Sequence, residues 1–214
     1  MIDARMFTVG PVQENCYIVS EKGSDRGVIV DPGDEAERLL AAVDALELKQ
    51  IDAILLTHTH FDHIGAVAPV AAATGAPVWC PELETQVLAN IMDYVPWPGF
   101  GPFESYAADH TVKGGETLEL AGLTIDVRFT PGHSPGHVTY AVRDGDALFS
   151  GDVLFQGSVG RVDLPGGDWP TLLASIESLM NEFPDETTVY PGHMGLTTLG
   201  RERAANPYLR ELAR

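Results

Sequence analysis

One short segment carries most of the chemistry in this chain: Thr57-His58-Thr59-His60-Phe61-Asp62-His63, preceded by the apolar run Ile54-Leu55-Leu56. As charged groups, histidines this close would repel one another, and as buried neutral rings each would need a polar partner. A bound metal ion removes both difficulties, because neutral imidazole and ionised carboxylate are good ligands for zinc and similar ions. The alternative is a set of solvated histidines on a loop. The pattern favours a metal site.

The spacing within this segment predicts how the side chains are arranged. His58 and His60 are two residues apart, so at the end of an extended strand both rings point to the same side. Asp62 and His63 fall where a following helix would begin, and they would project into the same space. We expect a strand over 53–56 and a helix over about 62–74 that ends at Gly75.

Four other strand-like runs also end in a polar residue. In chain order these residues are Asp31, His133, Asp152 and His193. A glycine stands immediately before each of the last three, which lets the backbone approach a crowded centre without a Cβ clash. Because the ends of successive strands meet at one rim of a core, we expect all of these side chains to converge.

These residues suffice for two divalent metal ions, with zinc expected first and iron or manganese as alternatives. Two cations would lower the pKa of a shared water enough to give a bridging hydroxide near neutral pH, so that no serine or cysteine nucleophile is needed. Asp62 and Asp152 are the predicted catalytic carboxylates, and Asp31 is expected to orient a ligand or the water. One ion would be held by His58, His60 and His133, the second by Asp62, His63 and His193, with Asp152 bridging.

Other polar and aromatic residues allow two interpretations each. The aromatic, proline-rich segment 93–106 is either a loop packed by its own side chains or a wall beside a substrate mouth, with Trp97 and Phe100 as contacts. Arg161 either forms an ion pair with Asp163, which we favour, or touches substrate. His137 is either a donor behind the metal site or a structural residue, which we favour. His110 is expected in a surface loop.

The composition is that of an ordinary globular protein, with 44% hydrophobic and 21% charged residues, and 214 residues predict one domain over 1–214. The net charge of −18 argues against a nucleic-acid partner but not against a small anionic substrate beside metal ions. The N-terminus lacks an apolar signal core, and the longest uncharged stretch, 65–81, is too short and too broken for a membrane span. We expect a cytoplasmic protein, with Cys16 and Cys80 as core thiols. The oligomeric state stays open.

The remaining pattern gives strands and then helices in each half of the chain, which suggests two sheets packed face to face with helices outside. Asp34 is expected to be the N-cap of the first helix. The further strands are expected over 6–9, 15–19, 27–30, 78–80, 117–120, 123–129, 137–142, 146–150 and 187–190. The helices are expected over 35–47, 81–92 and 170–182, and in the C-terminal sequence to residue 214.

This constellation resembles the metallo-β-lactamase superfamily, whose successive motifs match Asp31, the 58–63 cluster, His133, Asp152 and His193 in order. The resemblance implies an α/β, four-layer αβ/βα sandwich of two mixed sheets with a dinuclear site between them. Several segments resemble the glyoxalase II branch, which hydrolyses S-acylglutathione thioesters, typically S-lactoylglutathione. Those segments are Thr130-Pro131-Gly132-His133-Ser134-Pro135-Gly136, Gly160-Arg161-Val162-Asp163-Leu164-Pro165-Gly166-Gly167, Tyr190-Pro191-Gly192-His193, and Thr197-Thr198-Leu199-Gly200 with Glu202 and Asn206-Pro207.

Full-length glyoxalase II carries a further C-terminal helical domain that supplies basic groups for glutathione, so this chain is similar to the short, single-domain members. The leading hypothesis is a dinuclear metallohydrolase acting on a small thioester. A lactone or ester hydrolase would use the same residues, whereas a β-lactamase fits the glyoxalase-type segments poorly. A mononuclear iron persulfide dioxygenase would hold its iron with His58, His133 and Asp152. Nucleic-acid processing is disfavoured by charge, and a non-enzymatic module would be expected to lose ligands.

Overall fold

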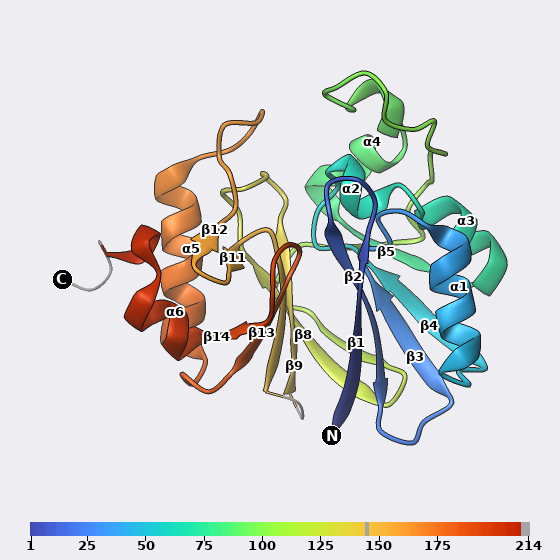
Figure 1. Cartoon of the computed structure of the whole chain (residues 1–214), viewed down its shortest axis with the longest axis horizontal. Coiled ribbons are helices and arrows are strands. Elements are labelled where there is room, and N and C mark those ends of the chain that lie inside the picture. Colours follow the sequence, from blue (N-terminus) through green and yellow to red (C-terminus); the bar gives the residue numbers. More distant parts are fainter. Residues whose placement is uncertain (144–145, 211–214) are drawn as a thin grey trace.

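Two six-stranded mixed β-sheets lie face to face in the computed structural model, which describes residues 1–143 and 146–210 (Figure 1). The first sheet has the strand order β1-β2-β3-β4-β5-β6, and its last four strands run parallel to one another. Its strands are β1 (Ile2–Val9), β2 (Glu14–Glu21), β3 (Arg26–Val30), β4 (Gln50–Leu55), β5 (Val78–Pro81) and β6 (His110–Val112).

The second sheet has the order β14-β13-β10-β9-β8-β7 and is antiparallel except between β10 and β13. A small hairpin, β11 (Leu154–Phe155) with β12 (Ser158–Val159), follows β10. The strands of the second sheet are β7 (Thr117–Leu120), β8 (Leu123–Phe129), β9 (Val138–Val142), β10 (Ala147–Gly151), β13 (Thr188–Pro191) and β14 (Thr197–Thr198).

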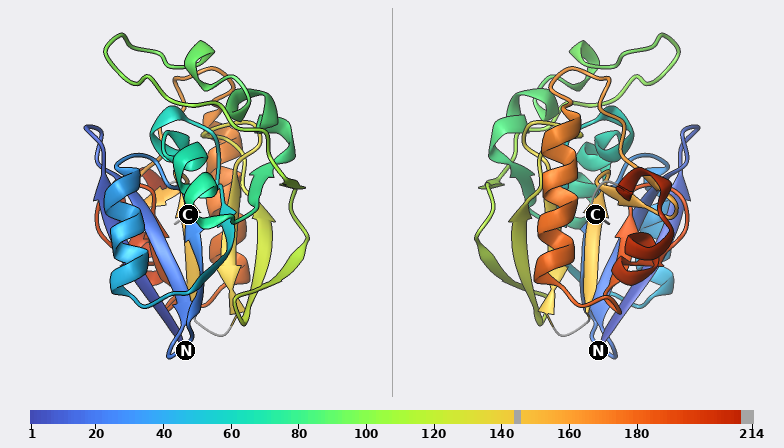
Figure 2. Two further views of the ribbon diagram at one scale, coloured as in Figure 1. Left: turned by 90° about the vertical axis from the view of Figure 1, so that its right-hand side faces the viewer. Right: turned by 90° about the vertical axis from the view of Figure 1, so that its left-hand side faces the viewer.

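Helices cover the outer faces of both sheets: α1 and α3 lie against the first, and α5 and α6 against the second (Figures 1 and 2). The α-helices are α1 (Ala36–Ala45), α2 (Phe61–Ile64), α3 (Val67–Thr74), α4 (Thr85–Leu88), α5 (Trp169–Glu182) and α6 (Leu199–Ala205). Short 3₁₀ turns are η1 (Glu82–Glu84), η2 (Ile91–Asp93) and η4 (Pro207–Leu209).

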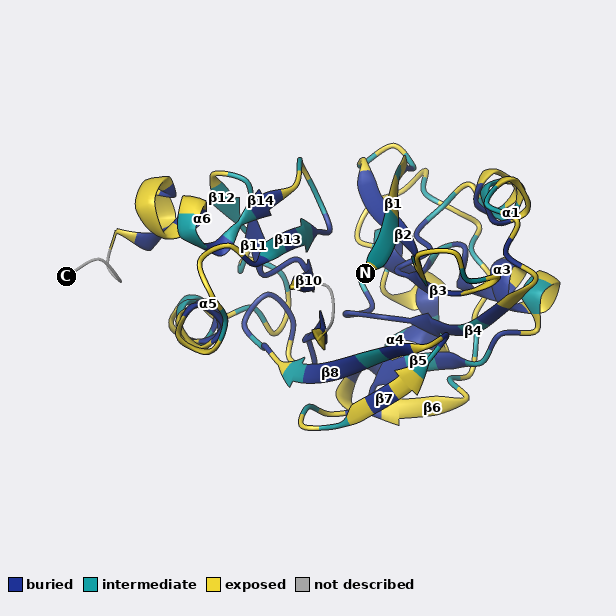
Figure 3. Cartoon of the chain, turned by 90° about the horizontal axis from the view of Figure 1, so that it is seen from below, coloured by how far each residue is buried: buried dark blue, intermediate teal, exposed yellow. Residues whose placement is uncertain are grey.

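The period-two alternation of apolar residues along the strands builds this layering. In β3, Ile29 packs with α1 and α3, whereas its neighbours Val28 and Val30 face the second sheet. In β10, Leu148 packs on the α5 side and Phe149 faces the first sheet. Both faces of each central sheet are therefore buried, and Figure 3 shows buried strands between helices whose outer faces are exposed. The predicted four-layer αβ/βα sandwich is confirmed.

The two sheets are joined by backbone hydrogen bonds at the rim where the site residues lie. The backbone N–H of Val138 donates to the carbonyl of Thr57 at 2.8 Å, and that of Asn15 donates to the carbonyl of Gly192 at 2.7 Å. Each bond therefore connects a segment of the first sheet with a loop or strand end of the second. The site residues follow the ends of strands that meet here.

Three expectations about helices are wrong. Asp34 is not the N-cap of α1, because Glu35 takes that position at φ 51° and the Asp34 carboxylate accepts from the Glu35 backbone N–H. The helix expected over 62–74 is divided into α2 and α3, since the N–H of Ala66 bonds to the Pro32 carbonyl of a neighbouring turn. The helix expected over 81–92 is divided into η1, α4 and η2, and Glu84 at the end of η1 is turned inward.

Other local expectations fare better. Gly75 ends α3 in the left-handed conformation at φ 68°, and Cys16 and Cys80 are buried free thiols, as predicted. His110 is exposed but begins β6, with its ring 4.3 Å from that of Trp79. Among the described residues, no helix has the length and apolar character needed to cross a membrane. Residues 211–214 of the expected C-terminal helix lie outside the described residues.

Candidate metal centre

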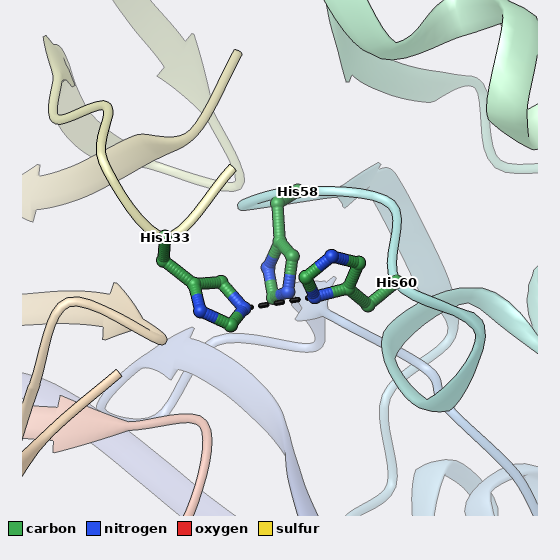
Figure 4. Close-up of side chains that lie close together, drawn as sticks. All are labelled: His58, His60 and His133. Atoms are coloured by element: carbon green, nitrogen blue, oxygen red, sulfur yellow. Dashed lines mark hydrogen bonds between the residues drawn. The ribbon is translucent and has the colours of Figure 1, made fainter. Parts of the chain in front are cut away.

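The first group of potential ligands comes from both sheets. His58 and His60 lie in the loop after β4, and His133 lies in the loop between β8 and β9. Nitrogen atoms of the three rings lie within 4.8 Å of one another. Nδ1 of His60 and Nε2 of His133 are 2.8 Å apart, as Figure 4 shows. This is the set predicted for the first metal ion.

The second group is also shared between the sheets. Asp62 and His63 belong to α2, and His193 follows β13. One ligand atom from each lies within 4.8 Å of the other two, and Oδ2 of Asp62 is 3.4 Å from Nε2 of His193. This is the set predicted for the second metal ion.

Asp152 lies between the two groups. Its Oδ1 is 3.3 Å from Nε2 of His63, and its Oδ2 is 3.4 Å from Nε2 of His133 and 3.5 Å from Nε2 of His193. A single carboxylate therefore faces both predicted ligand sets, which is the position that a bridging ligand needs.

Asp31 and Thr57 set the tautomers of two histidines. Oδ2 of Asp31 is 3.1 Å from Nδ1 of His63 and accepts from the Thr57 hydroxyl at 2.6 Å. Because the Thr57 hydroxyl donates its proton to Asp31, the Thr57 oxygen accepts from Nδ1 of His58 at 3.1 Å. Both rings then carry a proton on Nδ1 and direct Nε2 inward.

The inward atoms fit bound cations. Nε2 of His58 is buried and lacks a hydrogen-bond partner in the described structure, and Nε2 of His63 and Oδ1 of Asp152 are buried 3.3 Å apart without a well-aligned hydrogen bond. Buried polar atoms are rarely left in this state without a ligand or water to satisfy them. An alternative group of Asp31, His58 and His63 is also close enough to hold an ion. However, Asp31 already accepts from the backbone N–H and the hydroxyl of Thr57, which favours its predicted orienting role.

The outer nitrogens of two further histidines contact backbone carbonyl oxygens. Nδ1 of His133 donates to Arg161 at 2.7 Å, and Nδ1 of His193 donates to Gln13 at 3.2 Å. Metal-binding histidines commonly use the distal nitrogen in this way, because it fixes the ring and its tautomer. The side chain of Asn15 adds bonds to the carbonyls of Pro191 and Met194 and so holds the turn that carries His193.

His137 lies behind the two groups. Its Nε2 accepts from the backbone N–H of Asp152 at 3.1 Å, and its Nδ1 is 3.1 Å from the Thr130 hydroxyl. Burial lowers its pKa well below the usual value, which keeps the ring neutral. Of the two interpretations, the geometry supports the structural one, with His137 fixing the backbone of Asp152.

Glycine is required immediately before the three site residues for different reasons. A Cβ at Gly151, which has φ 45°, would lie 2.3 Å from the Thr57 hydroxyl, and one at Gly192 would lie 2.3 Å from Oδ1 of Asp152. Both positions therefore require glycine because of crowding at the site, as expected. At Gly132 the clash would be with the backbone of Leu172 in α5 instead. There the prediction is right about the residue but wrong about what it approaches.

The charges of the site residues are strongly coupled. Burial lowers the pKa of His58, and burial together with His133 lowers that of His60 to about 4. Burial alone would lower the pKa of His63, but Asp152 and Asp31 raise it well above the usual value. Burial alone would raise the pKa of Asp152, but His63, His193 and His133 outweigh burial and hold the pKa well below the usual value. Without a metal ion, His63 and Asp152 are therefore an ion pair, and binding a cation at Nε2 must release a proton.

Two buried glutamates near the site were missed by the sequence analysis. Glu14 is fully buried, its carboxylate oxygens lack hydrogen-bond partners in the described structure, and burial raises its pKa. Oε1 of Glu14 lies 3.8 Å from Nδ1 of His63. The position of Glu14 at the start of the apolar run of β2 could have indicated that its side chain is buried. Glu84, in contrast, stands beside other glutamates in the helix expected over 81–92, and nothing in the sequence singled it out.

The residues predicted to contact substrate gather around Phe61, which follows His60. The Phe61 ring centroid is 4.9 Å from that of Phe100 and 6.1 Å from that of Trp97. Arg161 pairs with Asp163 at 2.6 Å, as favoured, and its guanidinium lies 6.0 Å from the Trp97 ring centroid. The 93–106 segment thus packs on its own aromatic side chains and also beside Phe61, which lies between the candidate ligands His60 and Asp62 in the sequence.

The fold and site together define a class: αβ/βα sandwich proteins with a histidine- and aspartate-rich metal centre at one rim. Comparison with known families agrees, since the sequence profile of the metallo-beta-lactamase superfamily matches residues 9–193. The chain belongs to the metallo-beta-lactamase superfamily. Membership implies divalent metal binding, in agreement with the two clusters described above.

Individual relatives extend this comparison. The chain is 32% identical to hydroxyacylglutathione hydrolase GloC of Haemophilus influenzae over 210 residues, covering 97% of this chain and 98% of that protein. The solved structure of BLEG-1 B3 metallo-beta-lactamase superposes with a TM-score of 0.91 at 40% identity, covering 98% and 100% of the two chains. The di-iron-bound form of TTHA1623 superposes with a TM-score of 0.76 at 42% identity, covering 96% and 100%.

Proposed function

We propose that this protein is a dinuclear metal-dependent hydrolase of thioesters such as S-lactoylglutathione. The observation that carries the dinuclear centre is the position of Asp152, whose carboxylate lies within 3.5 Å of histidines from both groups of potential ligands. Similarity to GloC along almost the whole of both chains supports the thioester class. A cytoplasmic location and a small-molecule substrate belong to the same proposal, and the net charge of −18 disfavours nucleic acid.

Seven residues would hold the two ions, with zinc expected first. Divalent ions in such a centre would activate a water molecule and polarise the substrate carbonyl. The ligands would be His58, His60 and His133 for one ion, Asp62, His63 and His193 for the other, and Asp152 between them.

The residues around these ligands would keep the geometry ready before substrate arrives. Asp31 accepts from Nδ1 of His63 and, through the Thr57 hydroxyl, sets the tautomer of His58. His137 fixes the backbone of Asp152. Because these bonds are already made, little reorganisation is needed at the moment of reaction.

Substrate would be recognised at the aromatic side of the site. Trp97 is 43% exposed, and its ring lies between the ring of Phe61, the residue after His60, and the guanidinium of Arg161, so it offers an open apolar surface beside both. We assign Trp97, Phe100 and Arg161 to substrate contact on this basis. The ion pair with Asp163 reduces the charge that Arg161 can offer to a substrate carboxylate.

The experiment is hydrolysis of S-lactoylglutathione by purified protein whose bound metals are counted on the same sample. Turnover with about two metals per chain is the expected result. Asp152→Ala and His58→Ala should abolish turnover and leave the fold intact by circular dichroism. His110→Ala, a histidine exposed on β6, is the matched control and should keep full activity. Unchanged turnover in both site variants would refute the dinuclear mechanism.

A second candidate is β-lactam hydrolysis, favoured by the TM-score of 0.91 to the structure of BLEG-1 B3 metallo-beta-lactamase. A chromogenic cephalosporin tested on the same sample separates the two: faster turnover of the β-lactam would replace the thioester assignment. Lactones and simple esters belong in the same panel.

The iron persulfide dioxygenase is separated by metal stoichiometry and oxygen uptake. Iron alone would not indicate it, since TTHA1623 was solved with two irons. One iron per chain together with oxygen consumption would overturn the hydrolase proposal.

A further inference from the structure

Glu84 is a buried carboxylate that lies outside both ligand groups. It is 4% exposed, whereas its neighbours in η1, Glu82 and Leu83, face solvent. Burying an ionisable side chain is costly unless hydrogen bonds compensate for the lost water. The partners of Glu84 therefore indicate why the chain turns it inward.

One oxygen of Glu84 holds the loop that carries His58 and His60. Oε2 accepts from the backbone N–H of Thr59 at 2.7 Å and from the Thr59 hydroxyl at 2.9 Å. Thr59 stands between the two histidines, so these bonds fix the backbone from which both rings project.

The other oxygen holds the loop that carries His133. Oε1 accepts from the backbone N–H of Gly136 at 2.9 Å and from the hydroxyl of Ser134. Ser134 follows His133 directly. A single carboxylate, delivered by a third segment of the chain, therefore ties together two loops that belong to different sheets.

The surroundings leave space for this contact. A Cβ placed on Gly136 would lie 2.6 Å from Cγ of Glu84 and 3.1 Å from Oε1. The backbone of Gly136 is not in the left-handed region, so the requirement for glycine here is close approach rather than conformation. Glycine at this position is what lets the carboxylate reach the His133 loop.

The chemistry of the four donors requires a carboxylate rather than an amide. Two are backbone N–H groups, one from each loop, and these cannot reverse their direction. A glutamine would offer one acceptor oxygen and one NH₂ group, so one of the two N–H groups would face another donor. The hydroxyls of Thr59 and Ser134 could rotate to accept, but the backbone could not.

We propose that Glu84 is a positioning residue that sets the separation between His133 and the His58–His60 pair, and with it the affinity of the first metal position. The proposal rests on the proposed metal ligands. Partners that orient metal ligands typically contribute about 10- to 100-fold in metal affinity. We expect a loss in this range when the carboxylate is removed.

The test compares Glu84→Gln with Glu82→Gln, the same substitution at an exposed position of the same turn. Metal affinity is measured on folded protein by competition with a chromophoric chelator, and the ligand geometry is followed by the visible absorption of the cobalt-substituted protein. For Glu84→Gln we expect weaker binding of one metal equivalent by about 10- to 100-fold and an altered cobalt spectrum. For Glu82→Gln we expect wild-type values.

Wild-type affinity and spectrum in a folded Glu84→Gln protein would overturn the proposal, even if its melting temperature were lower. If wild-type protein binds no metal at these residues, the proposed function fails instead, so the two failures are distinguishable. Should Glu84→Gln not fold, Ser134→Ala removes one of the four bonds and leaves the carboxylate in place. It should weaken metal binding several-fold, and unchanged affinity there would equally overturn the proposal.

Discussion

Replacing Asp31 with asparagine should selectively weaken the second metal position. Asp31 has φ 49°, a region that asparagine tolerates, so the backbone turn should survive. Oδ1 of the new side chain keeps the bond from the Thr57 N–H, which is 2.7 Å long. Its NH₂ group, however, replaces Oδ2 and faces Nδ1 of His63 at about 3 Å. Two donors then oppose each other, and the proton of His63 is driven to Nε2, which points into the site.

The expected magnitude follows from the bond that is lost. A hydrogen bond to a charged group contributes about 1.5–3 kcal/mol, and each 1.4 kcal/mol is about tenfold in affinity. Metal affinity at the group that contains His63 should therefore fall by about 10- to 150-fold. The first group should be less affected, because the Thr57 hydroxyl can rotate to accept from the amide and still accept from His58.

The assay is a stepwise metal titration of the stripped protein, with the number of equivalents and both dissociation constants measured. Asp34→Asn makes the same chemical change three residues further on, where the carboxylate contacts the Glu35 backbone rather than a histidine. This control should bind both equivalents as wild type does. Two equivalents with unchanged affinity in Asp31→Asn would refute the orienting role, and equal weakening of both would refute its selectivity.

Two further predictions concern substrate binding and pH. Trp97→Ala should raise KM several-fold for the thioester with little change in kcat. Tyr94→Ala, at another exposed position of that segment, is the control and should change neither constant. A parallel fall in kcat for Trp97→Ala would contradict a binding role. In metal-stripped protein the His60 ring should titrate near pH 4 by NMR, because burial and His133 lower its pKa from 6.5. Since the folded pKa is the lower one, His60 should make the stripped protein less stable as pH falls from about 6.5 towards 4, and a midpoint near 6.5 would contradict this.

The site was largely predictable because its chemistry is concentrated in unusual residues. Histidines are rare and expensive to bury in groups, so the 58–63 cluster could hardly be anything but a metal site. The glycines before Asp152 and His193 indicated crowding. In the structure, a Cβ added at either glycine would lie 2.3 Å from a neighbouring side-chain atom. Local composition carried these signals without knowledge of the fold.

The parts that could not be predicted depend on tertiary contacts. Glu84 and Glu82 have the same side chain in the same turn, yet within the described part of the chain only the Glu84 carboxylate meets donors, and these come from residues 59, 134 and 136. Nothing local distinguishes the two. The break between α2 and α3 likewise arises from a bond between Ala66 and the distant Pro32. Propensity predicts one helix there, and tertiary structure overrides it.

The division of the ligand sets between the sheets bears on the order of events during synthesis. Each of the two predicted ligand groups takes two residues from 58–63 and its third from beyond residue 130. A nascent chain that ends before His133 can offer only two of the three predicted ligands of each ion, and the proposed bridging ligand Asp152 comes later still. Both proposed sets are therefore complete only after His193 has been synthesised and the second sheet has docked on the first. Metal binding would then stabilise only those chains whose two sheets have already docked on each other.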